Sequence, residues 1–213
     1  MDFARDGAEH IPAALTAATL DALRLLLAPC AASARLMPTP ALPPLLGAAD
    51  AIAAARLPRA RPVFARFFDK TADANWSLAW HQDRTIALQS RRDAPGFSAW
   101  TVKQGIAHAV PPFEYLERML ILRLHLDETS EAHAPLLVAP GSHRLGRLAE
   151  ADIPVAVERC GTRTCLAAAG DIWAYSAPIL HASGPMHALG RRRILQLAYS
   201  AEELPAGLEW LGV

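Results

Sequence analysis

From residue 61 onward the chain alternates short apolar stretches with turn-forming clusters. This pattern constrains the possible fold more than any other feature of the sequence. The stretches have the length of strands, and Gly, Pro, Asn and Asp separate them. No regular series of helices is interleaved, so the pattern indicates a sandwich or an open barrel. Two long spacers, residues 90–118 and 143–162, are expected to be irregular. The predicted strands are Val63–Phe68, Ser77–His81, Thr85–Gln89, Met119–Leu126, Leu136–Val138, Arg163–Ala167, Asp171–Ala174 and Arg193–Ser200.

The N-terminal quarter has a different pattern. Residues 11–36 are rich in Ala and Leu, with apolar positions at helical spacing and Thr19 as a candidate N-cap. A proline-rich stretch then interrupts regular structure, and Leu45–Arg56 predicts a second helix. We therefore expect one domain of 213 residues, in which residues 1–58 form a mostly helical cover and residues 61–213 form the β-barrel core.

Composition excludes several classes of function. The 21 basic and 21 acidic side chains cancel, so charge gives no argument for binding nucleic acid or an anionic membrane. No stretch reaches the roughly 18 to 20 uncharged apolar residues of a membrane span, and the first residues lack the basic region of a signal peptide. Three cysteines fit reduced thiols in a reducing compartment. We expect a cytoplasmic protein that acts on a small molecule; its oligomeric state stays open.

The sharpest local motif is Trp80-His81-Gln82-Asp83. On a strand, residues two apart point to the same side, so His81 and Asp83 could present an imidazole and a carboxylate to one cavity. These are two of the three ligands of the 2-His-1-carboxylate triad, which leaves open positions on iron. The spacing alone also occurs by chance, and a surface ion pair or a cap is then the alternative.

Two further features lie near the C-terminus. His181 follows an apolar stretch and precedes a turn of small residues, so it could supply a third ligand, or be a hydrogen-bonded core histidine. Arg191, Arg192 and Arg193 then lead into an apolar strand. Alternation puts Arg191 and Arg193 on one side and Arg192 on the other, without showing which side is inward. An inward guanidinium could bind a carboxylate through two parallel hydrogen bonds.

A turn motif, Pro140-Gly141-Ser142-His143, follows the apolar run Leu136–Val138. Pro-Gly is a strong turn signal. The position of His143 in the turn, next to Arg144, favours a structural hydrogen bond over metal binding.

Taken in order, these motifs resemble the phytanoyl-CoA dioxygenase family of 2-oxoglutarate oxygenases. In this chain Arg192 lies eleven residues beyond His181, which is the spacing between the distal histidine and the arginine in the family. The opening segment Phe3–Gly7 is similar to the signal for the first helix of the family. The resemblance thus covers nearly the whole chain. One departure is His133-Ala134-Pro135, which stands where family members often carry Asn-Gly. The matching motifs are His81-Gln82-Asp83, Pro140–His143, Gly170-Asp171, His181-Ala182-Ser183-Gly184 and Arg192.

The resemblance implies a mainly β fold with flanking helices: a double-stranded β-helix, or jelly-roll, cupin-like barrel. It implies Fe(II) on His81, Asp83 and His181, with 2-oxoglutarate as co-substrate and O2 as oxidant. It implies that Arg192 binds the 5-carboxylate of 2-oxoglutarate, with Ser183 beside it. Three weaker candidates could contact the co-substrate: Trp100, Asn75 and Lys70. The alternative for these residues is packing in the core or a place in an exposed turn. Polar residues near the motifs that could face a polar or anionic substrate are Gln82, Arg84, Lys103, Arg123 and His125.

The implied reaction oxidises a C–H bond of the substrate while 2-oxoglutarate becomes succinate and CO2. Related halogenases replace the carboxylate ligand with a small residue, so Asp83 favours hydroxylation. Two alternatives stay open: a non-catalytic barrel protein that binds a small acid, and a cupin-type metalloenzyme that does not use 2-oxoglutarate. The chain is short for the family, which implies a trimmed lid, and an acyl-CoA substrate is not carried over.

Overall fold

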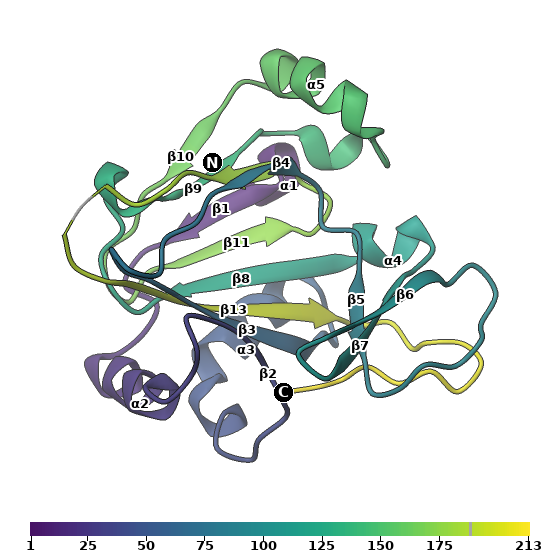
Figure 1. The fold of residues 1–213 in the computed structure, drawn as a ribbon, viewed down its shortest axis with the longest axis horizontal. Helices are drawn as coiled ribbons and strands as arrows, with labels where there is room; N and C mark the ends of the chain where they lie inside the picture. Colours follow the sequence, from purple (N-terminus) through teal and green to yellow (C-terminus); the bar gives the residue numbers. More distant parts are fainter. Residues whose placement is uncertain (188) are drawn as a thin grey trace.

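The computed structural model describes residues 1–187 and 189–213 and is built around a six-stranded antiparallel sheet (Figure 1). Strands from both ends of the chain meet in this sheet, with the long strands β8, β13 and β3 at its centre. In order across the sheet, the strands are β1 (Ala8–Ile11), β11 (Ile172–Ser176), β8 (Met119–His125), β13 (Arg192–Ser200), β3 (Arg61–Lys70) and β2 (Ser33–Leu36).

Two smaller sheets complete the β structure. The four-stranded sheet has the order β10 (Arg163–Cys165), β9 (Leu136–Val138), β12 (His181–Ser183) and β4 (Leu78–His81). The three-stranded sheet has the order β5 (Ile86–Leu88), β7 (Ile106–Val110) and β6 (Ser98–Lys103) and lies at the right of Figure 1. This arrangement confirms the expected mainly β, jelly-roll barrel with flanking helices.

Both faces of the six-stranded sheet are covered, which explains the near-continuous apolar sequence of β8. Alternate residues such as Leu122 and Leu197 are buried in one core with Leu23 of α2 (Ala17–Leu27) and Ala53 of α3 (Gly47–Arg56). The remaining residues, including Tyr175, face the interior of the barrel. Figure 1 shows α2 and α3 on the side of the six-stranded sheet away from β4 and β9.

The N-terminal segment is less helical than expected, and one predicted cap is wrong. Strands β1 and β2 lie within residues 1–58 and form the two edges of the six-stranded sheet. Helix α2 is capped by Thr16, because the backbone N–H of Thr19 donates to Thr16 Oγ1 at 3.1 Å. Thr19 therefore lies in the first turn of the helix.

The two spacers expected to be irregular also contain regular elements. Residues 90–118 include β6, β7 and α4 (Phe113–Glu117), and residues 143–162 include α5 (Ile153–Cys160). In β6 most side chains are exposed, so its sequence lacks the apolar alternation of a half-buried strand. The short helices are α1 (Phe3–Asp6) and the 3-10 turns Pro43–Leu45, Glu131–His133, Ser142–Arg144 and Glu150–Asp152. Within the described ranges, none of the helices has the length and apolarity to cross a membrane.

Candidate metal centre

Two histidines from neighbouring strands of the four-stranded sheet converge with one aspartate from the loop that follows β4. His81 ends β4 and pairs directly with His181 of β12, and their ring centroids are 4.2 Å apart. Side chains of directly paired residues share one face of a sheet. Asp83 lies two residues beyond the end of β4, in a loop, so strand alternation was the wrong reason to expect it beside His81. One potential ligand atom from each of the three residues lies within 4.8 Å of the others.

Backbone carbonyls orient both imidazoles in the same way. The Nδ1 of His81 lies 2.8 Å from the carbonyl oxygen of Ala79, and the Nδ1 of His181 lies 2.9 Å from that of Ile179. A carbonyl oxygen only accepts, so Nδ1 carries the proton and Nε2 keeps its lone pair free for a metal. Burial lowers the pKa of His181, which keeps this imidazole neutral as a ligand must be.

The turn motif holds the strand that carries His181. Ser142 Oγ donates to the carbonyl of Ala139 at 2.6 Å and accepts from the backbone N–H of Leu180 at 2.9 Å. The N–H of Ala139 donates to the carbonyl of Leu180 at 2.9 Å. Ser142 thus fixes the residue immediately before the candidate ligand.

His143 does not make the expected hydrogen bond to any described residue. Its buried Nδ1 has no partner there, and its ring instead lies against Gly7. A Cβ built on Gly7 would lie 2.2 Å from His143 Nδ1. The close approach of this ring therefore requires glycine at the end of α1.

A cavity lies between the six-stranded and four-stranded sheets, and the triad lines it. Arg192 reaches this cavity from β13 and is buried. Its guanidinium donates to the carbonyl of Ala134, while its buried Nε has no partner among the described residues. Burial and the nearby charge of Arg123 lower the pKa of Arg192 to about 9. A buried guanidinium with unused donors fits a carboxylate ligand.

Lys70 and Ser183 line the same cavity, and Ser183 shares a hydrogen-bond partner with Arg192. Lys70 Nζ donates to the carbonyls of Trp76 at 2.6 Å and Gly184 at 2.8 Å, and it lies 3.4 Å from Ser183 Oγ. Ser183 Oγ in turn donates to the carbonyl of Ala134, which also accepts from Arg192. Burial, with the charges of Arg192 and Arg123, lowers the pKa of Lys70 to about 7.

Ala134 has a positive φ of 53°. This conformation favours Gly or Asn and occurs at the place where family members often carry Asn-Gly. The turn at His133-Ala134-Pro135 therefore has the left-handed backbone that Gly or Asn adopts most readily.

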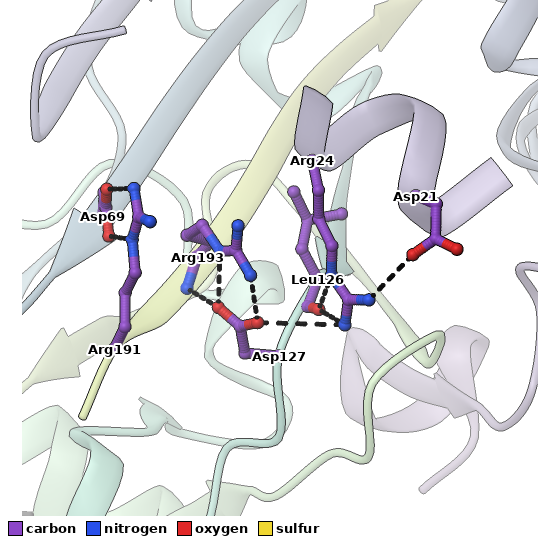
Figure 2. A network of polar contacts seen from close by, with 7 residues as sticks. All are labelled: Asp21, Arg24, Asp69, Leu126, Asp127, Arg191 and Arg193. Carbon is purple, nitrogen blue, oxygen red and sulfur yellow. Dashed lines mark hydrogen bonds and ion pairs between the residues drawn. The ribbon is translucent and has the colours of Figure 1, made fainter. Parts of the chain in front are cut away.

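Ion pairs on the opposite face of the six-stranded sheet explain why Arg192 is the inward arginine. Figure 2 shows Arg191 paired with Asp69 through two hydrogen bonds of 2.8 and 2.5 Å. Arg193 is paired with Asp127 at 2.7 and 2.8 Å, and Arg24 approaches the same carboxylate. The residue between two outward arginines must point inward.

Three candidates from the sequence line neither of the two cavities that contain His81 and Asp83, as far as the described residues define them. Asn75 makes two hydrogen bonds of 2.8 Å with the backbone of Met186 and fixes that loop. Trp100 of β6 packs on the barrel core, with the Arg91 guanidinium 5.8 Å from its ring. His125 is buried, and its Nδ1 lies 2.9 Å from Thr129 Oγ1.

The other substrate candidates divide between two cavities. Arg123 lines the triad cavity, where its Nη1 donates to Gln196 Oε1 at 3.0 Å. Gln82, Arg84 and Lys103 line a second cavity beside it. The amide of Gln82 is occupied by backbone groups: it donates to two carbonyls and accepts from the N–H of Leu148.

Sequence reasoning missed Arg66, Trp76 and Gln196, which also line the triad cavity. Alternation along β3 could have found Arg66, because it lies four residues before Lys70 and so shares its face. The same alternation along β13 places Gln196, four residues after Arg192, on the face of that arginine, whereas Trp76 lies outside the strands and carries no such signal.

Asp171 of the Gly-Asp motif has a structural role and lies away from the triad. It accepts from the backbone N–H groups of Ala13 and Ala168 at 2.8 Å each, and lies 2.8 Å from His10 Nε2. Burial opposes its ionisation, but these donors together lower its pKa. The carboxylate thus ties the N-terminal segment to the start of β11.

A jelly-roll barrel with two histidines and a carboxylate converging between its sheets defines the class of non-haem metal-binding barrel proteins. A family model described as phytanoyl-CoA dioxygenase (PhyH) matches residues 3–194, and the chain belongs to this family. Membership indicates activity of the iron- and 2-oxoglutarate-dependent oxygenase type. No curated protein matches the chain in sequence.

Solved structures share the fold at low sequence identity. HygX from Streptomyces hygroscopicus, with nickel and 2-oxoglutarate bound, is 16% identical with a TM-score of 0.63, covering 93% of this chain and 83% of HygX. EctD from S. alaskensis is 19% identical with a TM-score of 0.63, covering 93% and 74%. SnoN, a non-haem α-ketoglutarate-dependent epimerase from nogalamycin biosynthesis, is 18% identical with a TM-score of 0.66, covering 93% and 80%.

Proposed function

We propose that this protein is an Fe(II)- and 2-oxoglutarate-dependent dioxygenase that hydroxylates a small molecule. The observation that carries this proposal is the shared cavity: the triad of His81, Asp83 and His181 and the buried Arg192 line the same space between the sheets. A co-substrate with a 2-oxo acid at one end and a carboxylate at the other needs a metal and a cation at the two ends of one cavity. The nickel and 2-oxoglutarate in the structure of HygX support this pairing.

The donor set fits iron. His81 and His181 would each offer Nε2 and Asp83 a carboxylate oxygen, and such a 2-His-1-carboxylate set is typical of non-haem Fe(II) oxygenases. Bound Fe(II) would supply the one-electron chemistry with O2 that amino-acid side chains lack. In the balanced reaction, one oxygen atom of O2 enters the C–H bond of the substrate as a hydroxyl group. The other enters succinate as 2-oxoglutarate loses CO2.

The residues of the chain would bind and orient the co-substrate. Arg192 would pair with its 5-carboxylate, and Ser183 Oγ lies beside that position through their common partner Ala134. Lys70 places a further hydrogen-bond donor in the same cavity. Phe68 and Leu136 give the cavity apolar walls, which exclude water from the reacting atoms. We assign hydroxylation because Asp83 occupies the position that halogenases leave to a small residue.

Succinate release with Fe(II), ascorbate and 2-oxoglutarate tests the proposal. The wild-type protein should convert 2-oxoglutarate to succinate, and His81→Ala or Asp83→Ala should lower the rate at least about 100-fold, as expected when a metal ligand is lost. Binding of Ni(II), measured by calorimetry, should weaken in both variants. His187→Ala changes an exposed histidine and is the matched control.

Two other outcomes would overturn the assignment. Metal binding without succinate release, even with a broad panel of small molecules added, would point to a cupin-type metalloenzyme. Binding of 2-oxoglutarate without metal binding would point to a barrel protein that binds a small acid.

A further inference from the structure

A second cavity adjoins the triad from the other side. It has a volume of about 340 Å³ and shares His81, Asp83 and Arg66 with the co-substrate cavity. This volume lies at the small end of the roughly 300–1,000 Å³ typical of ligand sites. A molecule in this cavity would lie against two metal ligands while leaving the space around Arg192 free.

Three cations from three strands line this second cavity: Arg35 of β2, Arg66 of β3 and Lys103 of β6. We call them the basic cluster. Arg35 and Arg66 are directly paired across β2 and β3. Like charges opposite one another destabilise a sheet. None of the three makes an ion pair with any described acidic residue.

The two guanidiniums also leave hydrogen-bonding capacity unused. The Nε atoms of Arg35 and Arg66 are buried without a partner among the described residues. A buried donor without a partner costs free energy, so native structures rarely retain one unless a ligand or water satisfies it. Burial, followed by the charge of Arg35, lowers the pKa of Arg66 to about 10. Burial, followed by the charges of Arg35 and Arg66, lowers the pKa of Lys103.

Lys103 is held beside Arg35 by a specific clamp. Gln104, in the turn between β6 and β7, accepts from the backbone N–H of Arg35 at 2.7 Å and donates to the carbonyl of Ser33 at 2.9 Å. The clamp joins the edge of the three-stranded sheet to β2. It therefore maintains the proximity of like charges that would otherwise separate.

The other charged groups around this cavity do not neutralise the cluster. Asp83 is a candidate metal ligand, and Glu150 is exposed. Arg84 adds a fourth cation, with one N–H donated to the carbonyl of Leu148 at 3.0 Å. His108 Nδ1 donates to the carbonyl of Ile106, 3.0 Å away, and burial lowers the pKa of His108, so it adds no charge near neutral pH. The cavity therefore has an excess of positive charge.

We propose that the prime substrate is a small organic anion whose carboxylate or phosphate group is bound by Arg35, Arg66 and Lys103. Guanidinium groups match the planar oxygen pairs of both anions. The rest of the molecule then extends toward His81 and Asp83, where its C–H bond is oxidised. The description of this anion as the substrate rests on the proposed function, but its binding to the basic cluster does not.

Thermal unfolding of the metal-free protein at low ionic strength tests the binding. Inorganic phosphate and acetate are the probes, each titrated separately. We expect at least one of them to raise the Tm, with an apparent affinity that falls about tenfold in Arg35→Gln and in Lys103→Gln, the loss expected for one charged hydrogen-bonding group. A response to phosphate alone identifies a phosphate substrate, a response to acetate alone identifies a carboxylate, and a response to both supports the cluster as a general anion site.

Two control variants locate the bound anion. Arg192→Gln changes the co-substrate cavity, and Arg147→Gln removes an exposed arginine. Arg147→Gln should keep the full response of the wild-type protein, whereas Arg192→Gln should keep the part of the response that Arg35→Gln and Lys103→Gln weaken. Loss of the response in Arg192→Gln, or no response of the wild-type protein to either probe, would overturn the proposal.

The ligand-free proteins provide a second, independent measurement. Because Arg35 and Arg66 repel each other, Arg35→Gln should raise the Tm of the ligand-free protein at low salt, whereas loss of a structural arginine would lower it. A lower Tm in Arg35→Gln together with an unchanged anion response in Lys103→Gln would contradict the proposal. Succinate release by the wild-type protein is measured separately, so failure of anion binding and failure of the proposed dioxygenase activity can be told apart.

Discussion

Among the three consecutive arginines, charge pairing decides which one can serve the cavity. Arg191 and Arg193 are bound by Asp69 and Asp127 on one face of the sheet, so Arg192 points to the other (Figure 2). We predict that Arg192→Ala raises the KM for 2-oxoglutarate about 10- to 100-fold, corresponding to the ~1.5–3 kcal/mol of a charged hydrogen bond. Arg191→Ala should change this KM less than about twofold. Steady-state succinate release measures both, and the opposite ranking would refute the assignment of Arg192.

The buried ammonium of Lys70 predicts a pH dependence of stability. In the folded protein, burial lowers its pKa to about 7, from a value of 10.5 for an exposed lysine. Between these two values the unfolded chain binds the additional proton, so this group makes the free energy of unfolding rise with pH. Lys70→Met removes the contribution. The stability of the wild type relative to this variant should therefore increase from pH 7 to pH 10.

Denaturant unfolding of the metal-free proteins at several pH values, without 2-oxoglutarate, measures this difference. Parallel curves for the wild type and Lys70→Met across this range would show that Lys70 keeps its proton in the folded state.

For individual residues, the sequence predicted which residue types form the site but not the direction in which every side chain points. Alternation could not choose between Arg192 and its neighbours, because Ile194 and Leu195 are both apolar. The choice depends on Asp69 and Asp127, which lie 122 and 66 residues away from their arginine partners. Of the basic cluster, Lys103 was a candidate from the sequence, but Arg35 and Arg66 were missed because their pairing is a property of the sheet register.

The junction between α1 and β1 depends on a single glycine. Gly7 has a φ of 75°, and its missing Cβ leaves space for the ring of His143. Gly105 has a similar φ of 79° but open space around it. We predict that Gly105→Ala costs about 1 kcal/mol, from the left-handed backbone alone. Gly7→Ala should cost at least ~2–3 kcal/mol, because overpacking adds to the backbone strain.

Denaturant midpoints measure both losses. In the double variant Gly7→Ala/His143→Ala, the loss of stability due to overpacking should disappear. Only the loss due to the left-handed backbone should then remain. Equal losses in the two glycine variants would mean that the ring moves aside freely.

The elements that sequence patterns predicted best are those buried on both faces, such as β8 and β13. The pattern failed at β6, where exposed side chains on both faces leave no apolar periodicity. It also failed at β1 and β2, which are four residues long and flank the stronger signal of α2. Pairing of β1 with β11 and of β2 with β3 stabilises these two short edges, and that information is not local.

For the whole molecule, the covering helices and the barrel share one core. Leu23 of α2 is 0% exposed and lies in the same core as Leu122 of β8 and Leu197 of β13. Strands β1 and β2 add the N-terminal segment to the sheet itself. Residues 1–58 are therefore an integral part of the barrel, and we expect the chain to unfold as one cooperative unit.

Truncation of Leu23 tests this expectation. Leu23→Ala should lower the free energy of unfolding by about 2–5 kcal/mol, the cost of a cavity at a fully buried leucine. Leu25→Ala, at a position that is 78% exposed on the same helix, should change it by less than about 0.5 kcal/mol. Because the core is shared, hydrogen exchange at the slowest amides of α2 and of β8 should accelerate together in Leu23→Ala. Acceleration confined to α2 would mean that the helical cover opens separately from the barrel, and that the chain has two units of stability.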